Sequence, residues 1–216
     1  MYDIVFPKNN ENEFIKIAKE LGYTNLCFVY NLNEFKKATD GNFAGIITDE
    51  KNLNKAKKLA DFVILQSSDK DRHLIESGKA EIIFNLETTS RKDFIHHRAS
   101  GLNQVLCTLL NKKEVAIAFS FNTILKSEGM LRSQIMGRMM QNIRFARKYK
   151  FNLLFASFAQ SPFEMRAPHD LIAFAETLDM HPSEAKAAIK NTKTTIQQIT
   201  KKKSSNYLCD GIELVD

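Results

Sequence analysis

The sequence predicts an α/β fold, a distorted TIM-like (β/α) barrel built mainly from parallel strands. Short apolar runs alternate with longer segments whose apolar residues recur at helical spacing, and the alternation repeats about seven times. Strands separated by single helices have to pair in parallel. An open doubly wound sheet would satisfy the same order. The number of units favours the closed barrel, as does the length of 216 residues, close to the lower end of what such a barrel needs.

The predicted strands are the short apolar runs that polar or turn residues bound. They cover residues 2–6, 26–30, 43–47, 62–65, 82–84, 115–119 and 153–156. The predicted helices carry apolar side chains along one face. They lie within residues 14–21, 33–38, 53–60, 67–78, 102–110, 131–149, 168–178 and 182–199. Pro168 and Pro182 suit the first positions of the last two helices, where proline's missing N–H is harmless and its fixed φ helps.

We expect residues 1–216 to form a single TIM-barrel-like domain, since no linker rich in glycine or proline interrupts the chain. The lysine and serine run at residues 201–205 is the expected flexible piece. The tail after it, residues 207–215, is expected to add a last edge strand around Asp210 and Gly211.

The composition indicates a cytoplasmic protein. Hydrophobic residues make up 44% of the chain, yet no apolar run approaches the roughly 20 residues that span a bilayer. The first residues are too polar and acidic for a signal peptide. The cysteines, Cys27, Cys107 and Cys209, are far apart and odd in number, so they fit neither a disulfide framework nor a zinc site. A reducing compartment is therefore expected.

The positive charge is concentrated late in the chain. Residues 131–203 hold 13 Lys and Arg against 5 Asp and Glu, whereas residues 1–130 hold 18 against 17. Such asymmetry is typical of a surface that meets a polyanion. A lysine-rich solvated face would give the same composition.

No catalytic centre is predicted. None of the five histidines forms an H-x-H pair on a predicted strand, and His96 and His97 are adjacent in a loop, where they would not converge on one ion. Asp3, Asp49 and Glu87 follow or lie on predicted strands and could approach one another, but three carboxylates alone make a poor catalytic metal site. The sequence contains no nucleophile elbow, Walker loop or G-x-G-x-x-G motif.

The predicted helix at residues 131–149 offers candidates for phosphate binding. Apolar residues occupy one side, and the other side carries Arg138, Arg144, Arg147 and Lys148. Long donors on one helical face can contact successive phosphates, and arginine presents a planar fork suited to phosphate oxygens. Arg132 falls beside the apolar stripe and could reach back toward the end of the barrel. The alternative is an ordinary amphipathic helix with a solvated outer face.

Further cations follow predicted strands, in loops or at helix starts, so several could line one rim of the barrel. They are Arg72, Arg91, Arg98 and Arg166. Arg166 lies in the short loop before Pro168, which holds a cation at the carboxyl end of the strand at residues 153–156. Lys186 lies one turn into the helix after Pro182, close to Arg166 in sequence. A local cap or ion pair is the other possible role for Arg166.

Two long segments carry a family resemblance. Residues 91–127 read RKDFIHHRASGLNQVLCTLLNKKEVAIAFSFNTILKS, and residues 153–189 include EMRAPHDL and LDMHPSEAKAAI. In this order they resemble the protein component 3 family of ribonuclease P in its archaeal form. Residues 67–84 have similar spacing, and the resemblance is weakest over the first sixty or so residues.

The resemblance implies a TIM-like barrel related to the polymerase and histidinol phosphatase superfamily. It implies a protein subunit of ribonuclease P, the endoribonuclease that removes the 5′ leader of precursor tRNA. In that particle the catalytic RNA carries the chemistry through bound magnesium, and the protein needs no cofactor. The implied partners are the catalytic RNA, precursor tRNA, protein component 2 and the other protein subunits. The implied RNA-binding positions are Arg72, Arg91, Arg166 and Lys186, with Lys112 or Lys113.

Two alternatives from other functional classes stay open at this point. The first is a stand-alone metal-dependent phosphoesterase of the same barrel superfamily, which the missing histidine pairs disfavour. The second is an interaction protein whose basic face meets an acidic protein. Most of the sixteen phenylalanines lie in apolar stripes, so base-specific recognition is not predicted.

Overall fold

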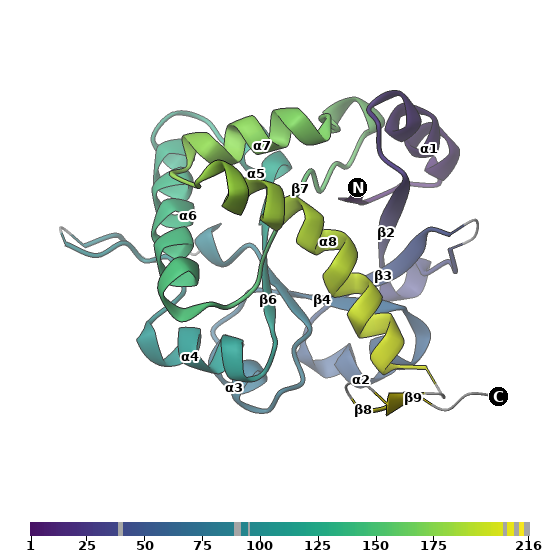
Figure 1. The fold of residues 1–216 in the computed structure, drawn as a ribbon, viewed down its shortest axis with the longest axis horizontal. Helices are drawn as coiled ribbons and strands as arrows, with labels where there is room; N and C mark the ends of the chain where they lie inside the picture. Colours follow the sequence, from purple (N-terminus) through teal and green to yellow (C-terminus); the bar gives the residue numbers. More distant parts are fainter. Residues whose placement is uncertain (39–40, 89–91, 95, 205–206, 210–211, 214–216) are drawn as a thin grey trace.

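Seven parallel strands follow one another in the order of the chain (Figure 1). The computed structural model describes residues 1–38, 41–88, 92–94, 96–204, 207–209 and 212–213. The strands are β1 (Tyr2–Val5), β2 (Asn25–Asn31), β3 (Phe43–Thr48), β4 (Phe62–Gln66), β5 (Ile82–Phe84), β6 (Ala116–Ser120) and β7 (Leu153–Ala156). Each strand pairs in parallel with the next one along the chain. The predicted barrel with mainly parallel strands is confirmed.

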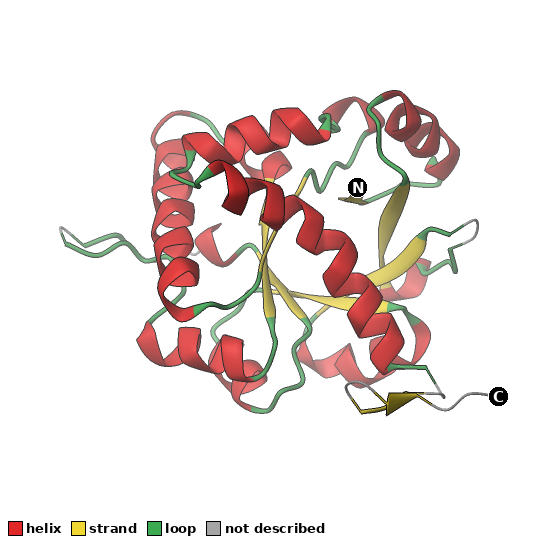
Figure 2. Ribbon diagram, viewed as in Figure 1, coloured by secondary structure: helices red, strands yellow, loops and turns green. Residues whose placement is uncertain are grey.

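Helices cover the outside of the strands (Figure 2). They are α1 (Glu11–Glu20), α2 (Leu53–Leu59), α3 (Asp71–Glu76), α4 (Gln104–Lys112), α5 (Phe121–Lys126), α6 (Gly129–Tyr149), α7 (Pro168–Thr177) and α8 (Pro182–Lys202). Short 3-10 turns lie at η1 (Leu32–Glu34), η2 (Glu50–Asn52), η3 (Leu86–Thr88) and η4 (Pro162–Glu164). The predicted helix at residues 33–38 is therefore wrong, since only a 3-10 turn forms there. A separate short helix, α5, precedes the predicted long one.

The seven strands form a nearly closed barrel, and a buried carboxylate joins the first strand to the segment after the last. Asp3 of β1 accepts hydrogen bonds from the Ser157 backbone N–H at 2.7 Å and the Ser157 hydroxyl at 2.5 Å. Two residues further on, the Phe6 N–H donates to the Ala159 carbonyl at 2.8 Å. Asp3 is fully buried, and this burial raises its pKa to about 6 although the hydrogen bonds from Ser157 oppose the shift.

The lumen of the barrel is packed with side chains. Alternate residues of the strands point inward and form one apolar cluster, which includes Ile4, Cys27, Val29, Phe62, Ile64, Ile82, Phe84, Ala116, Ala118, Leu154 and Ala156. Gly45 leaves the room that the Phe62 ring occupies, because a Cβ on this glycine would lie 2.4 Å from that ring. A second, larger cluster fills the layer between strands and helices.

The long helix α8 covers the gap between β7 and β1 and crosses to the amino-terminal ends of the strands (Figure 2). Ile196 of α8 is fully buried in the same cluster as the lumen residues. Asn152, just before β7, donates to the Thr195 hydroxyl at 2.6 Å. The Lys203 ammonium donates to the Asp61 carbonyl, just before β4, at 3.1 Å. The helix thus closes the end of the barrel at which the strands begin.

The tail forms a small antiparallel pair, β8 (Tyr207–Cys209) and β9 (Ile212–Glu213), in a sheet separate from the barrel. The described strands of the tail are therefore no edge of the barrel, and the predicted centre of that strand, Asp210 and Gly211, lies outside the described residues. The run at 201–205 begins inside α8, and its last residue is likewise not described. Across the described ranges, no helix has the length and apolar character needed to cross a bilayer.

Candidate RNA interface

The predicted cations lie on different sides of the barrel. Arg72 is in α3, Arg132 to Arg147 are in α6, Arg166 follows β7, Lys186 is in α8, and Lys112 and Lys113 lie at the end of α4. Arg91 lies outside the described residues. The single rim expected from the sequence therefore divides into several local arrangements.

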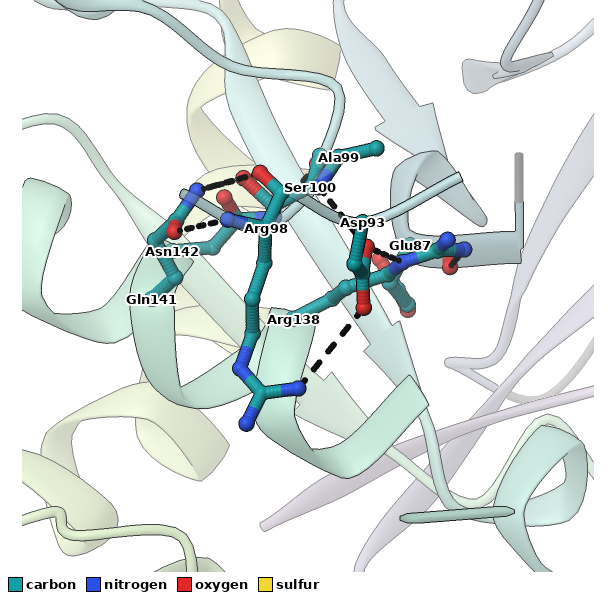
Figure 3. A network of polar contacts seen from close by, with 8 residues as sticks. All are labelled: Glu87, Asp93, Arg98, Ala99, Ser100, Arg138, Gln141 and Asn142. Carbon is teal, nitrogen blue, oxygen red and sulfur yellow. Dashed lines mark hydrogen bonds and ion pairs between the residues drawn. The ribbon is translucent and has the colours of Figure 1, made fainter. Parts of the chain in front are cut away.

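The loop before α4 is fastened to α6 by a polar network (Figure 3). The Arg138 guanidinium donates from Nε to Asp93 Oδ1 at 2.8 Å and from Nη1 to the Glu87 carbonyl at 2.9 Å. The Gln141 amide pairs with both backbone groups of Arg98, accepting from its N–H at 3.0 Å and donating to its carbonyl at 2.9 Å. The loop is therefore held at both its side chains and its backbone.

Arg138 is the clear correction to the predicted helix face. It was expected on the solvated side of α6, and the residue is only 3% exposed. The reason is that the loop carrying Asp93 packs over this side of the helix and surrounds the guanidinium with acceptors. Its N–H groups donate hydrogen bonds to acceptors within the protein.

Arg98 shares the carboxylate of Asp93 with Arg138. Its Nη1 lies 3.6 Å from Asp93 Oδ2, and the residue is exposed. The guanidinium lies flat against Gly137 of α6, where an added Cβ would come within 2.5 Å of it. Glu87, fully buried in the same network, has a pKa that burial raises to about 7 while Arg138 opposes the shift.

The outer arginines of α6 tie this helix to the start of α8. Arg147 forms a two-pronged contact with Glu184, from Nε at 2.8 Å and from Nη2 at 2.7 Å, and also donates to the Asp179 carbonyl. The hydrogen bond from Arg147 lowers the pKa of Glu184 to about 2. Arg144 lies 3.5 Å from the Asp179 carboxylate. Both arginines are exposed, so they keep an outward side.

Arg132 and Arg166 are turned toward backbone carbonyls. Arg132 reaches back over the turn before α6 and donates to the Ser127 carbonyl at 2.6 Å. Arg166 donates to the Met165 carbonyl at 2.7 Å and lies over the Phe121 ring at 5.7 Å. Its own carbonyl accepts from the Tyr23 hydroxyl at 2.8 Å, which fixes the loop. Arg166 thus has the local role that the sequence left as its alternative.

Arg72 has an internal partner, since it pairs with Glu76 one turn further along α3, at 2.8 Å. Three predicted lysines differ from the arginines in this respect. Lys112, Lys113 and Lys186 are exposed, and the described part of the chain shows no ion pair for them. These lysines are positioned to meet an external anion without breaking an internal contact.

The carboxyl-terminal mouth of the barrel, where α/β barrels usually hold their active sites, is a cavity of about 400 Å³. Phe6, Phe84 and Phe158 form its floor, with the last two rings 4.4 Å apart. Amide and hydroxyl side chains surround this floor, with two lysines, Lys8 and Lys126, and a single carboxylate, Glu34. Phenyl rings offer no ligand to a hard metal ion.

The three carboxylates considered for a metal site have separate surroundings. Asp3 bonds to Ser157 and Asp49 accepts from the Asn52 N–H in η2, whereas the Glu87 carboxylate is buried and its oxygens accept no hydrogen bond from the described residues. Within the described residues, no three His, Cys, Asp or Glu side chains come together as metal ligands would.

The opposite end of the barrel gathers cations that the sequence analysis missed. Here a groove of about 380 Å³ is lined by Lys57, Lys113, Lys150, Lys202 and Lys203, together with Glu81 and Glu114. Only Lys113 was among the predicted residues. A signal was present in the sequence, since each of these lysines lies in or just after the last turn of a helix. The prediction considered mainly cations that follow strands, and such residues lie at the carboxyl-terminal rim.

Comparison with known proteins places the chain in a family. The family model described as RNase P subunit p30 matches residues 49–204. Ribonuclease P protein component 3 of Methanococcoides burtonii is 30% identical, with 97% of this chain and 89% of that protein covered. The same component of Methanosarcina mazei is 28% identical, with 96% and 90% covered.

Two solved structures share the fold. A chain of a cryo-EM structure of archaeal ribonuclease P with mature tRNA superposes with a TM-score of 0.82 at 22% identity, covering 99% of this chain and 98% of that chain. A histidinol phosphate phosphatase from Lactococcus lactis superposes with a TM-score of 0.52 at 9% identity, covering 83% and 94%. The family match over residues 49–204 and the relative that is 30% identical over nearly the whole chain show that the chain belongs to the RNase P subunit p30 family.

Proposed function

We propose that this protein is a subunit of archaeal-type ribonuclease P and supports the removal of the 5′ leader from precursor tRNA. Family membership carries the proposal: the p30 match over residues 49–204 and the relative that is 30% identical over nearly the whole chain. The barrel's phenylalanine-floored mouth favours this role over a stand-alone metal-dependent phosphoesterase.

The protein contributes binding and positioning, and the RNA contributes the chemistry. Basic side chains lower the repulsion between phosphates where RNA helices pack, so the active fold of the catalytic RNA becomes more populated. Magnesium is held by the RNA, and no cofactor is held by the protein. The protein works in the cytoplasm, in a particle with the catalytic RNA, precursor tRNA, protein component 2 and the other protein subunits.

Reconstitution tests the proposal. The catalytic RNA of ribonuclease P from the same cell is assembled with component 2, with and without this protein, and cleavage of precursor tRNA is followed at limiting magnesium. We expect the protein to raise the rate and to lower the magnesium concentration needed for half-maximal cleavage. The isolated protein, supplied with manganese or zinc, is expected to leave a chromogenic phosphate ester intact. Equal cleavage rates with and without the protein would contradict the proposal.

A further inference from the structure

The groove at the amino-terminal end of the barrel brings together lysines from four helical units. We call it the lysine groove and define it by Lys57 of α2, Lys113 after α4, Lys150 after α6, and Lys202 and Lys203 at the end of α8. In Figure 1 the last turns of α6 and α8 lie toward the same lower side as α2 and α4. Segments far apart in the sequence thus place positive charge around one hollow.

The lysine groove keeps a net positive charge after its internal ion pairs are counted. Its five lysines face two carboxylates, Glu81 and Glu114, which leaves a net charge of +3. Glu81 lies 3.1 Å from Lys203 and 3.5 Å from Lys57, and Glu114 pairs with Lys202. Asn111, Asn152 and Gln198 add neutral side-chain amides to the walls. Ammonium groups are suited to phosphate oxygens.

Two of the lysines have no internal counter-charge in the described part of the chain. Lys113 and Lys150 are both exposed, and neither has an ion pair among those residues. A cation in the last turn of a helix is favourable for the helix itself, which would account for some lysines here. Lys150 and Lys203 directly follow the last turns of their helices, so they share this effect. The effect acts on each helix separately and does not require lysines from four helices to meet around one hollow.

Lys150 stands where the backbone favours a different residue. Its φ is 60°, in the left-handed region that glycine adopts most easily and that commonly ends a helix. A lysine at this position costs about 1 kcal/mol relative to glycine. Glu114, on the other wall, has a φ of 54°. Both positions can therefore be changed to glycine without introducing backbone strain. Such a substitution removes the side-chain charge without lowering the stability of the fold through the backbone.

We propose that the lysine groove binds the phosphate backbone of the ribonuclease P RNA, so that the RNA is seated on the end of the barrel opposite its mouth. The inference rests on the proposed function and adds the surface that carries it. Most of the predicted arginines already donate to carboxylates or carbonyls of the protein, whereas Lys113 and Lys150 of the groove are exposed and have no ion pair among the described residues. Lysine acts here as a point charge on a flexible stem, which suits contact with phosphates irrespective of base sequence.

The composition of the groove favours RNA over an acidic protein. Interfaces between proteins are depleted in lysine and depend on buried aromatic or arginine anchors. The aromatic side chain that lines the groove, Phe151, is only 5% exposed and offers no such anchor. A lysine-lined hollow with amide walls matches the sequence-independent part of nucleic-acid binding.

The test measures RNA binding by the protein together with component 2 across a series of salt concentrations. The groove variant combines Lys113→Gln with Lys150→Gly. The control variant combines Lys8→Gln, at the mouth, with Lys16→Gln in α1, so that both variants lose two exposed positive charges. We expect the groove variant to bind about tenfold more weakly near physiological salt, with a log–log salt slope smaller in magnitude by about two. The control should keep the wild-type slope.

A variant that makes the groove more positive provides a second test. Glu114→Gly removes the carboxylate that faces Lys202 and relaxes the left-handed backbone, so it should bind the RNA about threefold more tightly. Thermal unfolding is expected to be no earlier for Lys150→Gly or Glu114→Gly than for the wild type. Weaker binding by Glu114→Gly would overturn the inference.

The outcomes separate the groove from the proposed function. Normal RNA binding by the wild type, with equal affinity and slope in the groove variant, would overturn the groove and leave the function standing. Loss of component 2 from the groove variant, with RNA binding intact, would show a protein contact and would also overturn it. A wild-type protein that neither binds the RNA nor stimulates cleavage would overturn the proposed function itself.

Discussion

Asp3 shows at the scale of one residue how closure of the barrel depends on pH. Its pKa is about 6 in the folded protein, above the ordinary value of about 4. Between these pH values the folded state holds more protons than the unfolded state, so the free energy of unfolding falls as the pH rises. We expect the wild type to lose about 2 kcal/mol relative to Asp3→Asn between about pH 4 and pH 7, measured by urea denaturation.

The control for this prediction is Asp3→Ala. It leaves the Ser157 N–H and hydroxyl without their acceptor at the seam, so it should be less stable than Asp3→Asn at every pH, by about 2 kcal/mol. Glu87, a buried carboxyl whose pKa is also raised, is present in all three proteins and cancels in the comparison. A difference between wild type and Asp3→Asn that stays constant with pH would show that Asp3 titrates normally.

Arg138 gives the second prediction for a single residue. Replacing it with Met removes the 2.8 Å hydrogen bond to Asp93 and the donor to the Glu87 carbonyl from a site that is nearly closed to water. We expect Arg138→Met to lower the free energy of unfolding by about 3 kcal/mol, while Arg144→Met, on the exposed side of α6, costs below about 1 kcal/mol. Urea denaturation measures both. Equal, small losses would place Arg138 outside the structural network.

Arg138 also marks a limit of sequence reading at this scale. Helical spacing places Arg138 at the border between the apolar and polar faces of α6, next to Met139. Spacing alone does not show which residues at this border another segment of the protein buries. The cover comes from a loop more than forty residues earlier in the chain. The partners of Arg147 and Arg144, Glu184 and Asp179, also lie more than thirty residues away in the sequence and could not be predicted from it.

At the scale of elements, the contact between Arg147 and Glu184 joins the last part of α6 to the first turn of α8. The pKa of Glu184 is lowered to about 2, so its contribution to stability is complete above its ordinary value of about 4 and is lost as the pH falls toward 2. Both side chains are more than a third exposed, at 42% and 35%, so solvent screening keeps the pair modest.

A double-mutant cycle on Arg147→Met and Glu184→Gln tests this link between the helices. We expect a coupling free energy of about 0.5–1 kcal/mol at pH 7, which shrinks at about pH 3 as the carboxylate begins to take up its proton. Arg144 and Asp179, which form a longer contact at 3.5 Å, serve as the comparison cycle and should couple more weakly. A coupling that is the same at both pH values would mean that charge does not hold these helices together.

Helices and strands were predictable where the spacing of apolar residues was regular and polar residues or prolines marked both ends of the segment. All seven barrel strands and the helices after Pro168 and Pro182 form close to the predicted residues. The helix α5 was missed because it begins directly after β6 with no polar linker; Ser120, the last residue of the strand, accepts from the Thr123 N–H and starts the helix. Tertiary contacts, and not local pattern, separate these two elements.

At the scale of the whole molecule, the sequence predicted the barrel but not how seven strands close it. Parallel order and length follow from the periodic pattern, whereas the seam depends on a contact between Asp3 and Ser157, at opposite ends of the fold's sequence. The use of α8 to close the amino-terminal end is equally non-local. Closure of that end brings the helix termini together, and so it creates the lysine groove that a strand-by-strand reading overlooked.

The last prediction concerns α8 as part of the barrel's core. Ile196 is fully buried among the lumen side chains, whereas its neighbour Gln197 is exposed. Ile196→Ala should lower the free energy of unfolding by about 3 kcal/mol, because it removes buried methyl groups and leaves a cavity in a closed lumen. Gln197→Ala should change it by less than about 0.5 kcal/mol.

Denaturation followed by both circular dichroism and tyrosine fluorescence distinguishes the possible roles of α8. If the helix completes the core, both probes should report one shared transition in the wild type and in Ile196→Ala, displaced to lower denaturant in the variant. A small loss of stability in Ile196→Ala, or an early separate transition in the helical signal, would instead describe a helix that only lies on the outside. In that case the lysine groove would lose its fixed wall, since Lys202 and Lys203 take their positions from this helix.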